Sequence, residues 1–313
     1  MKHTPKRKIN SAYLEGKRTC WPRWRLYTFV ALILTLCMPT GCALMDKSSS
    51  MEFTPVTNPP TGIHLQGKFV WNDLLTDNVA AAKDFYGPLF GWTFEQLRGY
   101  TVVKNDGQNI GGMAQVEDKS EPPGAARWLC ALSVADVDEV VALVDKEGGT
   151  VNEGPEDMKN RGRGAIISDP QGAQLLVMHA IGGDPEDKEP ALGSWLWHEL
   201  WSNDTEASLA FYQKLVGYDY FGEMDDYLVL TRGEQWRAGI RYSSDSDLEM
   251  RWVPVVRVAD TEDMAARAKK LGGKVLVEPM ATDNGGSVAL LSDPSGAFLI
   301  VQYWPANLFE QEK

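Results

Sequence analysis

Cysteine and histidine are scarce in this 313-residue chain, which has four of each. Cys20 and Cys37 lie in a basic and apolar N-terminal segment, and Cys42 closes that segment. Cys130 is therefore alone downstream, where it has no partner for an intramolecular disulfide. Because Cys130 sits in the apolar run WLCALSV, we expect a buried core thiol rather than a nucleophile.

Several catalytic signatures are also missing. The sequence has no Gly-x-Ser-x-Gly elbow, no phosphate-binding Gly-Lys-Ser/Thr loop, no Cys-x-x-Cys pair and no His-Glu-x-x-His helix. Asn203-Asp204-Thr205 matches the glycosylation pattern, but it precedes a helical stretch and is better explained as a helix cap. The chemistries that those motifs carry are not expected here.

Basic residues are few once the N-terminus is set apart. Residues 1–42 contain eight Lys and Arg and one acid, so the remainder has 23 basic against 42 acidic side chains. A formal charge near −19, against −12 for the whole chain, repels phosphate backbones and anionic lipid headgroups. Nucleic acid is therefore not an expected partner, and membrane attachment would have to come from a lipid.

Residues 1–42 have the features of an export signal. The basic side chains precede an apolar run at 26–38, which is too short to span a bilayer but suits a signal peptide. Small residues then lead to Cys42, as in a bacterial lipoprotein signal, although Pro39 stands where such signals usually have Leu. We expect Cys42 to be acylated, and Ala43 resembles Gram-negative sorting signals for the outer membrane, facing the periplasm. An ordinary cleavable signal and an uncleaved anchor are alternatives.

The rest of the chain contains an internal duplication. WNDLLTDNVAAAKDFYGPLFGW begins at Trp71 and WHELWSNDTEASLAFYQKLVGY begins at Trp197, with seven of 22 positions identical. Two later landmarks repeat in the same order, namely Gly-Gly at 148–149 and 272–273, and Asp-Pro-x-Gly-Ala from Asp169 and Asp293. The chain therefore carries two modules of one plan.

Hydrophobic periodicity predicts an α+β fold for both modules. In each module a short strand, a helix and three short strands occur twice. We expect four βαβββ units, paired into two curled mixed sheets that each form a cup with the helices outside. The predicted organisation is a lipoprotein-type signal at 1–42, a flexible tether at 43–66, module 1 at 67–180, a linker at 181–192, module 2 at 193–305 and a tail at 306–313.

The landmarks are Phe-Tyr-x-x-Leu-x-Gly in the first helix, Gly-Gly after the second helix and Asp-Pro-x-Gly before the last strand. In this order they resemble the vicinal oxygen chelate superfamily, which includes glyoxalase I, bleomycin-resistance proteins and extradiol dioxygenases. The resemblance implies a cup in which enzymes of the family bind a divalent metal through His or Glu at three places. Those places here hold Trp71, about Leu129 and Leu176 in module 1, and Trp197, about Val253 and Ile300 in module 2. Because these side chains offer no usable lone pair, we expect no metal and no cofactor.

Polar side chains share the inward face of the cups. Because side chains alternate along a strand, the acids two places after Trp71 and Trp197 face the same way as the tryptophans. An arginine two places before the fifth-strand ligand place shares that phase, so an acid and a guanidinium are expected to meet in each cup. The predicted ligand-binding residues are Trp71, Asp73, Arg127, Trp197, Glu199, Arg251 and Gln302, and Gln174, Met178 and Phe298 complete the lining. The alternative is that each ion pair is purely structural.

The side chains of the three histidines that follow the signal segment are not expected to face a cup. His198 alternates with Trp197 and faces the other way, His179 follows the last strand of module 1, and His64 lies in the tether. Surface positions or satisfied hydrogen bonds are expected for all three.

These features predict a protein that binds a small organic ligand without a metal, as bleomycin-resistance proteins do, and no catalytic residue is assigned. One alternative is a metal-dependent lyase or dioxygenase of the same superfamily with relocated ligands. The other is an envelope scaffold whose cups are filled by side chains. Whether the modules face each other within one chain or across a homodimer is left open.

Overall fold

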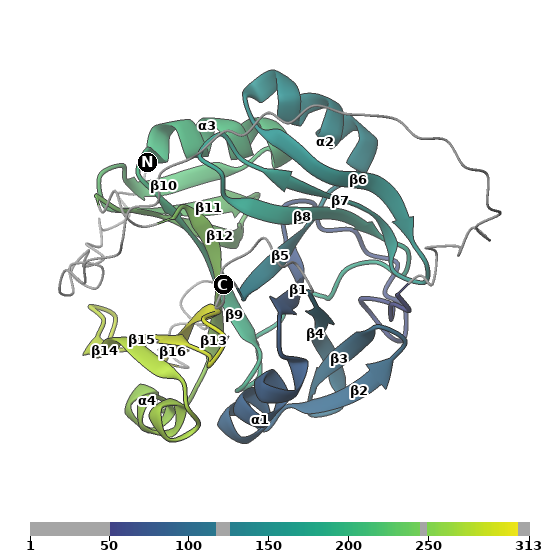
Figure 1. The fold of residues 1–313 in the computed structure, drawn as a ribbon. Helices are drawn as coiled ribbons and strands as arrows, with labels where there is room; N and C mark the ends of the chain where they lie inside the picture. The colour runs from purple at the N-terminus through teal and green to yellow at the C-terminus, as the bar shows by residue number, and fades with distance from the viewer. Residues whose placement is uncertain (1–50, 117–125, 245–248, 306–313) are drawn as a thin grey trace, which may run out of the picture.

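A computed structural model describes residues 51–116, 126–244 and 249–305. The predicted signal segment, Cys42 and the tail at 306–313 lie outside these ranges. Within them, the order strand, helix and three strands occurs four times along the chain (Figure 1). The α+β class and the tandem arrangement of two modules predicted from the sequence are confirmed.

Module 1 contributes eight strands and two helices. The strands are β1 (Phe69–Thr76), β2 (Thr93–Leu97), β3 (Tyr100–Asn105), β4 (Gln108–Gln115), β5 (Arg127–Ser133), β6 (Thr150–Met158), β7 (Gly162–Ser168) and β8 (Gln174–Ala180). The helices are α1 (Val79–Phe90) and α2 (Val137–Val144), the latter continued by a 3-10 turn, η2 (Asp145–Glu147). The strands form one sheet in the order β2-β3-β4-β1-β5-β8-β7-β6.

Module 2 repeats this plan. Its strands are β9 (Trp195–Ser202), β10 (Asp219–Glu223), β11 (Tyr227–Arg232), β12 (Gln235–Tyr242), β13 (Arg251–Arg257), β14 (Lys274–Ala281), β15 (Ser287–Ser292) and β16 (Phe298–Tyr303). Its helices are α3 (Thr205–Val216) and α4 (Thr261–Lys270). The sheet order, β10-β11-β12-β9-β13-β16-β15-β14, is that of module 1.

Each sheet consists of two halves joined at its centre. In module 1, β1 and β5 pair antiparallel, while β1 is parallel to β4 and β5 to β8. The same pattern joins β9, β13, β12 and β16. Figure 1 shows both sheets strongly curved, and we call their concave faces cup 1 in module 1 and cup 2 in module 2.

Each helix begins at a polar side chain that accepts a hydrogen bond from the backbone of the first turn, with distances of 2.8–3.1 Å. Such a cap satisfies amide groups that have no partner within the helix. The cap expected at Asn203-Asp204-Thr205 is confirmed, because Asp204 caps α3. The four capping residues are Asn78, Asp136, Asp204 and Asp260.

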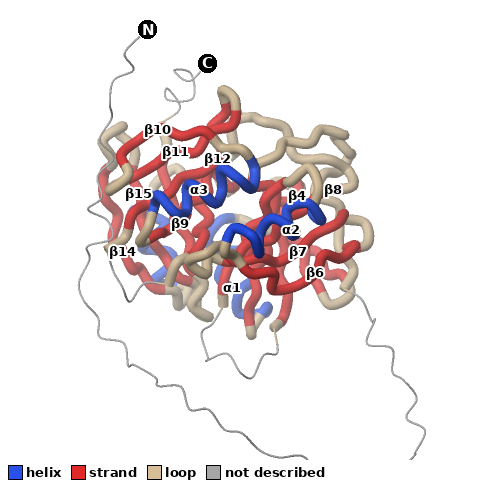
Figure 2. The backbone as a smooth tube through the Cα atoms, turned by 90° about the horizontal axis from the view of Figure 1, so that it is seen from above, coloured by secondary structure: helices blue, strands red, loops and turns tan. Residues whose placement is uncertain are grey.

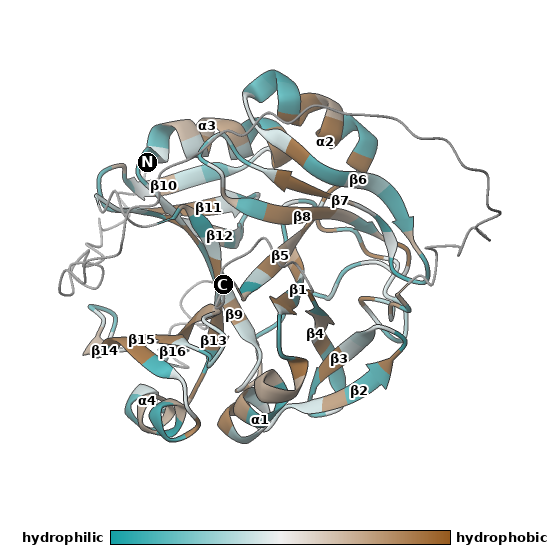
Figure 3. Ribbon diagram, in the orientation of Figure 1, coloured by the Kyte–Doolittle hydropathy of each residue, from teal (hydrophilic) through white to brown (hydrophobic). Residues whose placement is uncertain are grey.

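The helices cover the outer faces of the sheets and pair across the modules. In Figure 1, α2 lies beside α3 and α1 lies beside α4, and Figure 2 shows the α2–α3 pair from above. One hydrophobic cluster joins Val140 of α2 to Phe211 of α3, and another joins Phe85 of α1 to Ala268 of α4. Figure 3 shows hydrophobic residues along central strands such as β1 and β4, and hydrophilic residues along the edge strands β2 and β6.

The repeated landmarks bond to each other across the module boundary. The hydroxyl of Tyr86, from the Phe-Tyr motif of module 1, donates to Asp293 of the second Asp-Pro motif at 3.2 Å. Tyr212 donates to Asp169 at 3.2 Å in the reciprocal contact. Burial raises the pKa of both tyrosines well above the ordinary value, and burial also raises the pKa of both carboxyls. The motifs that mark this fold in the sequence therefore join its two modules.

Cys130 is free and buried in β5, as expected. Burial raises the pKa of its thiol, which keeps the sulfur protonated and unreactive. The helices within the described ranges are all too short or too polar to cross a membrane.

The segment 51–66, part of the predicted tether, has no helix or strand but packs against module 1. Val56 and Thr57 are buried, and the Thr57 hydroxyl donates to the carbonyl of Gly182 at 3.1 Å. Figure 1 shows this segment, in purple, between strands β2–β4 and strands β6–β8. It therefore lies at the mouth of cup 1.

Candidate functional site

A tryptophan, an acid and a tyrosine meet in cup 1. Trp71 is 1% exposed, and its Nε1 donates to Asp73 Oδ1 at 2.9 Å and to the Tyr100 hydroxyl at 3.0 Å. The Tyr100 hydroxyl donates in turn to Asp73. Burial, and then the negative charge of Asp73, raise the pKa of Tyr100 well above its ordinary value, so that its hydroxyl stays neutral.

The same three residue types meet in cup 2. Trp197 Nε1 donates to the Tyr227 hydroxyl at 2.8 Å, and Glu199 lies beside that hydroxyl. Burial raises the pKa of Tyr227, with a further contribution from Glu199. The inward orientation that the sequence predicted for the tryptophan and the acid of each module is therefore what the structure shows.

Glycines on the neighbouring strands make room for the tyrosines. Gly112 on β4 and Gly239 on β12 lie against the hydroxyls of Tyr100 and Tyr227, and an added Cβ at either position would overlap the hydroxyl. At Gly239 the added Cβ would also come within 3.0 Å of Trp197 Nε1. The close approach of each tyrosine to its tryptophan therefore requires glycine at these places.

The ion pair in cup 1 differs from the one predicted. Asp73 pairs with Arg161, from the turn before β7, with Oδ2 3.4 Å from NH1, and the expected Asp73–Arg127 pair is not formed among the described residues. The side chain of Arg161 is fully buried, and its NH2 donates to the Tyr100 hydroxyl at 3.0 Å. Arg127 begins β5 opposite Leu75, at the end of the strand and away from Asp73.

Aromatic rings surround the Arg161 guanidinium and fill cup 1. The guanidinium carbon lies 4.8 Å from the Phe53 ring centre, 4.5 Å from that of Trp71 and 5.0 Å from that of Tyr100. Arg161 Nε also donates to the carbonyl of Thr54 at 3.1 Å. Because Phe53 and Thr54 belong to the segment 51–66, the chain itself occupies cup 1.

In cup 2 the acid pairs with an arginine from a different element. Glu199 accepts from Arg241 Nε at 2.8 Å and from Arg241 NH2 at 3.1 Å, a two-pronged contact, and Trp201 Nε1 donates to Glu199 at 2.9 Å. The Arg241 guanidinium carbon lies 4.7 Å from the Tyr227 ring centre. Arg241 lies on β12, next to its last residue, so it is not the counterpart of Arg161, which lies in a turn.

The arginine predicted for this pair lies elsewhere in cup 2. Arg251, at the start of β13, stacks on Phe298 with its guanidinium carbon 4.8 Å from the ring centre, and it pairs with Glu249 rather than with Glu199. Burial lowers the pKa of Arg251; Glu249 partly offsets this, and Arg127 lowers the pKa further. The two predicted arginines therefore lie near each other, at the ends of the central strands β5 and β13.

Cup 2 exposes aromatic rings that have no counterpart in cup 1. Trp197 is half-buried, Trp236 is 37% exposed and Phe221 is 46% exposed. The ring centres of Trp197 and Trp236 are 6.4 Å apart, and those of Phe221 and Trp236 are 5.3 Å apart. A register shift in the β11–β12 pairing places Trp236 opposite Thr231, on the cup face of the strand.

The remaining predicted lining residues also lie on the cup strands. Gln302 is half-buried on β16 opposite Val288. Met178 is buried in the hydrophobic cluster of cup 1, and Phe298 packs against that of cup 2. Gln174 begins β8 opposite Ser168.

The donor set of the cups does not fit a metal. The described part of the chain has no group of three or more His, Cys, Asp or Glu that could hold an ion. In cup 1 the carboxylate of Asp73 already accepts hydrogen bonds from Trp71, Tyr100 and Arg161, and an indole N–H offers no lone pair. His198 is buried outside the cups and bonds to Asn72, as its strand phase predicted.

The two tyrosines and the two arginines that pair with the acids were not predicted from the sequence. A signal for the tyrosines was present, since Tyr100 opens YTVVKN and Tyr227 opens YLVLTR, each followed by a strand with a glycine at the same distance. Arg161 and Arg241 gave no such signal, because they occupy different places in the two modules.

Comparison with known proteins gives the family. The model of the Glyoxalase/Bleomycin resistance protein/Dioxygenase superfamily matches residues 64–177 and 196–301, and the chain belongs to this superfamily. It is 31% identical over 258 residues to the putative glyoxylase CFP32 of Mycobacterium tuberculosis, covering 78% of this chain and 97% of the relative. It is 29% identical over 260 residues to the anthracycline biosynthesis protein DauV of Streptomyces sp. strain C5, covering 75% and 93%.

Solved structures share the fold. A Mn(II)-bound glyoxalase from Novosphingobium aromaticivorans matches with a TM-score of 0.54 and 16% identity, over 77% of this chain and 83% of that one. The 2,3-dioxygenase LapB from Pseudomonas sp. KL28 matches with a TM-score of 0.53 and 12% identity, over 76% and 93%. At these identities the likeness concerns the fold alone.

Proposed function

We propose that the chain binds a small planar organic molecule in cup 2 and does so without a metal. The proposal rests on one difference between cup 1 and cup 2. Both cups hold the same cluster of tryptophan, acid and tyrosine, but Trp71 is 1% exposed beneath the segment 51–66, whereas Trp197 is half-buried beside the exposed rings of Trp236 and Phe221. Cup 1 is filled by the chain, and cup 2 presents its aromatic surface to a ligand.

The chemistry of cup 2 favours a planar ligand with a polar substituent. Ring pairs contribute about 0.5–1.5 kcal/mol each beyond the area that they bury, and Trp197, Trp236 and Phe221 provide three faces. The Glu199–Arg241 pair lies in the same cup against the Tyr227 ring, and the half-buried Gln302 lies on β16 of the same sheet. A mostly apolar surface with a few convergent polar groups is typical of small-molecule sites.

A metal-dependent reaction is not favoured by these residues. The solved structures that share the fold include a Mn(II)-bound glyoxalase and a 2,3-dioxygenase. The places that the resemblance gave for metal ligands in cup 2 hold Trp197, Val253 and Ile300, and Glu199 is engaged by Arg241 and Trp201. A single engaged carboxylate does not make a catalytic metal site, which needs about three protein donors.

Calorimetric titration tests the proposal. Catechol, a naphthalenediol and an anthracycline serve as probes, chosen because one structure with the same fold is a 2,3-dioxygenase and one sequence relative is an anthracycline biosynthesis protein. We expect saturable binding of at least one probe and a loss of about tenfold or more, about 1.4 kcal/mol, in Trp236→Ala. Tyr242→Ala is the matched control, since Tyr242 lies on the same strand with the same 37% exposure but faces away from the cup.

Two outcomes would contradict the proposal. One is the absence of binding heat for every probe. The other is an equal loss in Trp236→Ala and Tyr242→Ala, because binding would then not depend on the aromatic surface of cup 2.

We further propose that the chain is exported and held at the envelope by a lipid on Cys42. The support is the basic segment, the short apolar run and the small residues before Cys42. Labelled palmitate should enter the wild-type protein in a bacterial host and not the Cys42→Ala variant, which should leave the membrane fraction. Label or membrane retention in Cys42→Ala would reject the proposal.

A further inference from the structure

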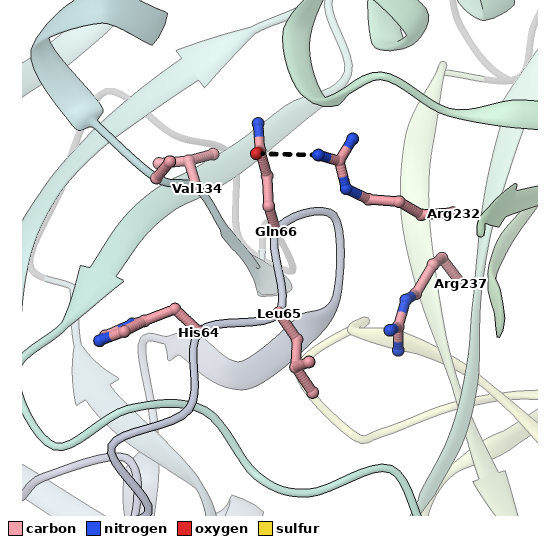
Figure 4. Close-up of a pocket in the computed structure, with 7 residues that line it drawn as sticks. His64, Leu65, Gln66, Val134, Arg232 and Arg237 are labelled. Atoms are coloured by element: carbon pink, nitrogen blue, oxygen red, sulfur yellow. Dashed lines mark hydrogen bonds between the residues drawn. The ribbon is translucent and has the colours of Figure 1, made fainter. Parts of the chain in front are cut away.

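A cavity of about 310 Å³ lies where the two modules meet, away from both cups (Figure 4). Its walls come from the segment before β1, the end of β5 and the β11–β12 hairpin. We call it the junction cavity, and the residues that line it are His64, Leu65, Gln66, Val134, Ala135, Arg232 and Arg237. Figure 4 shows both arginines on one side of Leu65, while the ring of His64 points away from them.

Neutral groups hold Arg232 in place. Its NH2 donates to Gln66 Oε1 at 3.1 Å, and its NH1 donates to the carbonyls of Gly217, at 3.2 Å, and Val216. These carbonyls end α3, where the helix dipole favours a cation. No carboxylate lies within 4.0 Å of the Arg232 guanidinium among the described residues, so no ion pair offsets its charge.

Arg237 shares its carboxylate with another cation. Its NH1 and NH2 donate to the two oxygens of Asp187 at 2.7 and 2.9 Å, and Lys68 Nζ lies 2.7 Å from the same Asp187 Oδ1. Asp184 is the other nearby acid, and its Oδ2 already accepts from Ser133 at 2.6 Å. Lys68 and Arg237 therefore share one carboxylate, and Arg232 has no ion-pair partner among the described residues, in a chain whose net charge is −12.

Arg237 also has an unused donor. Its side chain is 7% exposed, and its Nε is buried without a hydrogen-bond partner in the described structure. A buried donor without an acceptor costs about 1–3 kcal/mol, so an acceptor placed there is favoured. The register shift that turns Trp236 into cup 2 also turns Arg237 toward the junction cavity.

We propose that the junction cavity binds a small organic anion, with its carboxylate or phosphate group at Arg232 and Arg237. The forked guanidinium matches the oxygens of both groups and carries a permanent charge. Leu65 and Val134 form an apolar wall for the body of the ligand. The volume is at the lower end of the range of about 300–1,000 Å³ that small-molecule sites occupy.

Titration calorimetry of the folded chain with phenyl phosphate and benzoate tests this site, with phenol as the uncharged control. We expect at least one anion to bind saturably, more weakly at high salt, and phenol not to bind at the junction. Arg237→Gln should weaken anion binding at least tenfold. Arg163→Gln is the control, because it removes the same charge from a half-buried arginine on β7 that does not line the cavity, and it should leave binding unchanged.

A second variant distinguishes the loss of the binding site from the loss of the fold. Ala135→Trp places a bulky side chain at an exposed position in the cavity wall and leaves both arginines in place. It should abolish anion binding at the junction cavity while retaining the wild-type melting temperature. Binding that survives in Ala135→Trp, equal losses in Arg237→Gln and Arg163→Gln, or no binding of either anion would overturn the proposal.

Discussion

Asn72 and His198 occupy equivalent places in the two modules, 126 residues apart, and they bond to each other across the boundary, with His198 Nε2 2.9 Å from Asn72 Oδ1. Both side chains are buried, and the ring of Phe69 stacks on the imidazole at 4.2 Å. When two copies of a module pack symmetrically, equivalent residues of the copies come into contact at the symmetry axis that relates them. A pair of unlike residues there places a donor opposite an acceptor, which a buried polar pair needs.

The burial of His198 predicts a pH dependence of stability. Desolvation lowers the pKa of this imidazole to about 3 in the folded state, against 6.5 when it is exposed. The unfolded chain therefore takes up the proton first, so the contribution of His198 is complete above pH 6.5 and is lost as the pH falls toward 3. Within that window, each unit by which the pH falls should lower the free energy of unfolding by about 1.4 kcal/mol because of His198.

Urea unfolding of the wild type and His198→Gln across this window measures the effect. Carboxylates contribute to both proteins, so the difference between the two slopes isolates His198. Identical slopes for the wild type and His198→Gln would show that His198 does not titrate in this window.

The Tyr86–Asp293 bond predicts coupling between the modules. Tyr86→Phe leaves a buried carboxylate with one donor fewer and should lower the free energy of unfolding by about 1–3 kcal/mol. Tyr303→Phe, at a residue that is 39% exposed, should change it little. In a double-mutant cycle with Asp293→Asn the two losses should not add, and additive losses would mean that the bond contributes nothing.

Much of the fold and half of the site followed from local patterns. The duplication and the landmarks gave the two modules, and alternation along a strand placed Trp71, Asp73, Trp197 and Glu199 on the cup faces. Alternation depends only on the strand itself, so it can be counted from the sequence.

The arginines that pair with Asp73 and Glu199 are brought to them by tertiary structure. They could therefore not be identified by counting residues along a strand. Arg127 has the right phase, but it lies at the end of β5, whereas Arg161 reaches Asp73 from a turn 88 residues away in the sequence. The register shift that brings Trp236 into cup 2 also leaves no simple period in the sequence. The filling of cup 1 by Phe53 depends on the path of an irregular segment.

The buried ion pairs predict large effects of removing one partner. Arg161→Met leaves Asp73 charged and buried and should lower the free energy of unfolding by about 3–5 kcal/mol, and Arg241→Met should do the same to Glu199. Adding Asp73→Asn to Arg161→Met should recover part of the loss. Arg163→Met changes a half-buried arginine two residues away and should affect urea unfolding much less, and a loss there as large as in Arg161→Met would reject the explanation.

The donor set of the cups predicts that metal removal has no effect. Protein purified without chelator should carry less than a stoichiometric amount of any divalent ion, and prolonged dialysis against a chelator should leave its melting temperature unchanged. The reason is that Asp73 and Glu199 are each engaged by an arginine and a tryptophan. A stoichiometric ion that is lost in Asp73→Ala or Glu199→Ala would establish a metal site and favour a metal-dependent enzyme.

Gly239 predicts a steric test of the cup 2 cluster. Gly239→Ala places a methyl group against the hydroxyl and ring of Tyr227 and near Trp197 Nε1, so it should destabilise the fold by about 1–3 kcal/mol. In a Tyr227→Ala background the same substitution should cost much less in urea unfolding, because the overlapping ring is gone. An undiminished cost there would mean that the backbone of β12, rather than contact with Tyr227, requires glycine at this place.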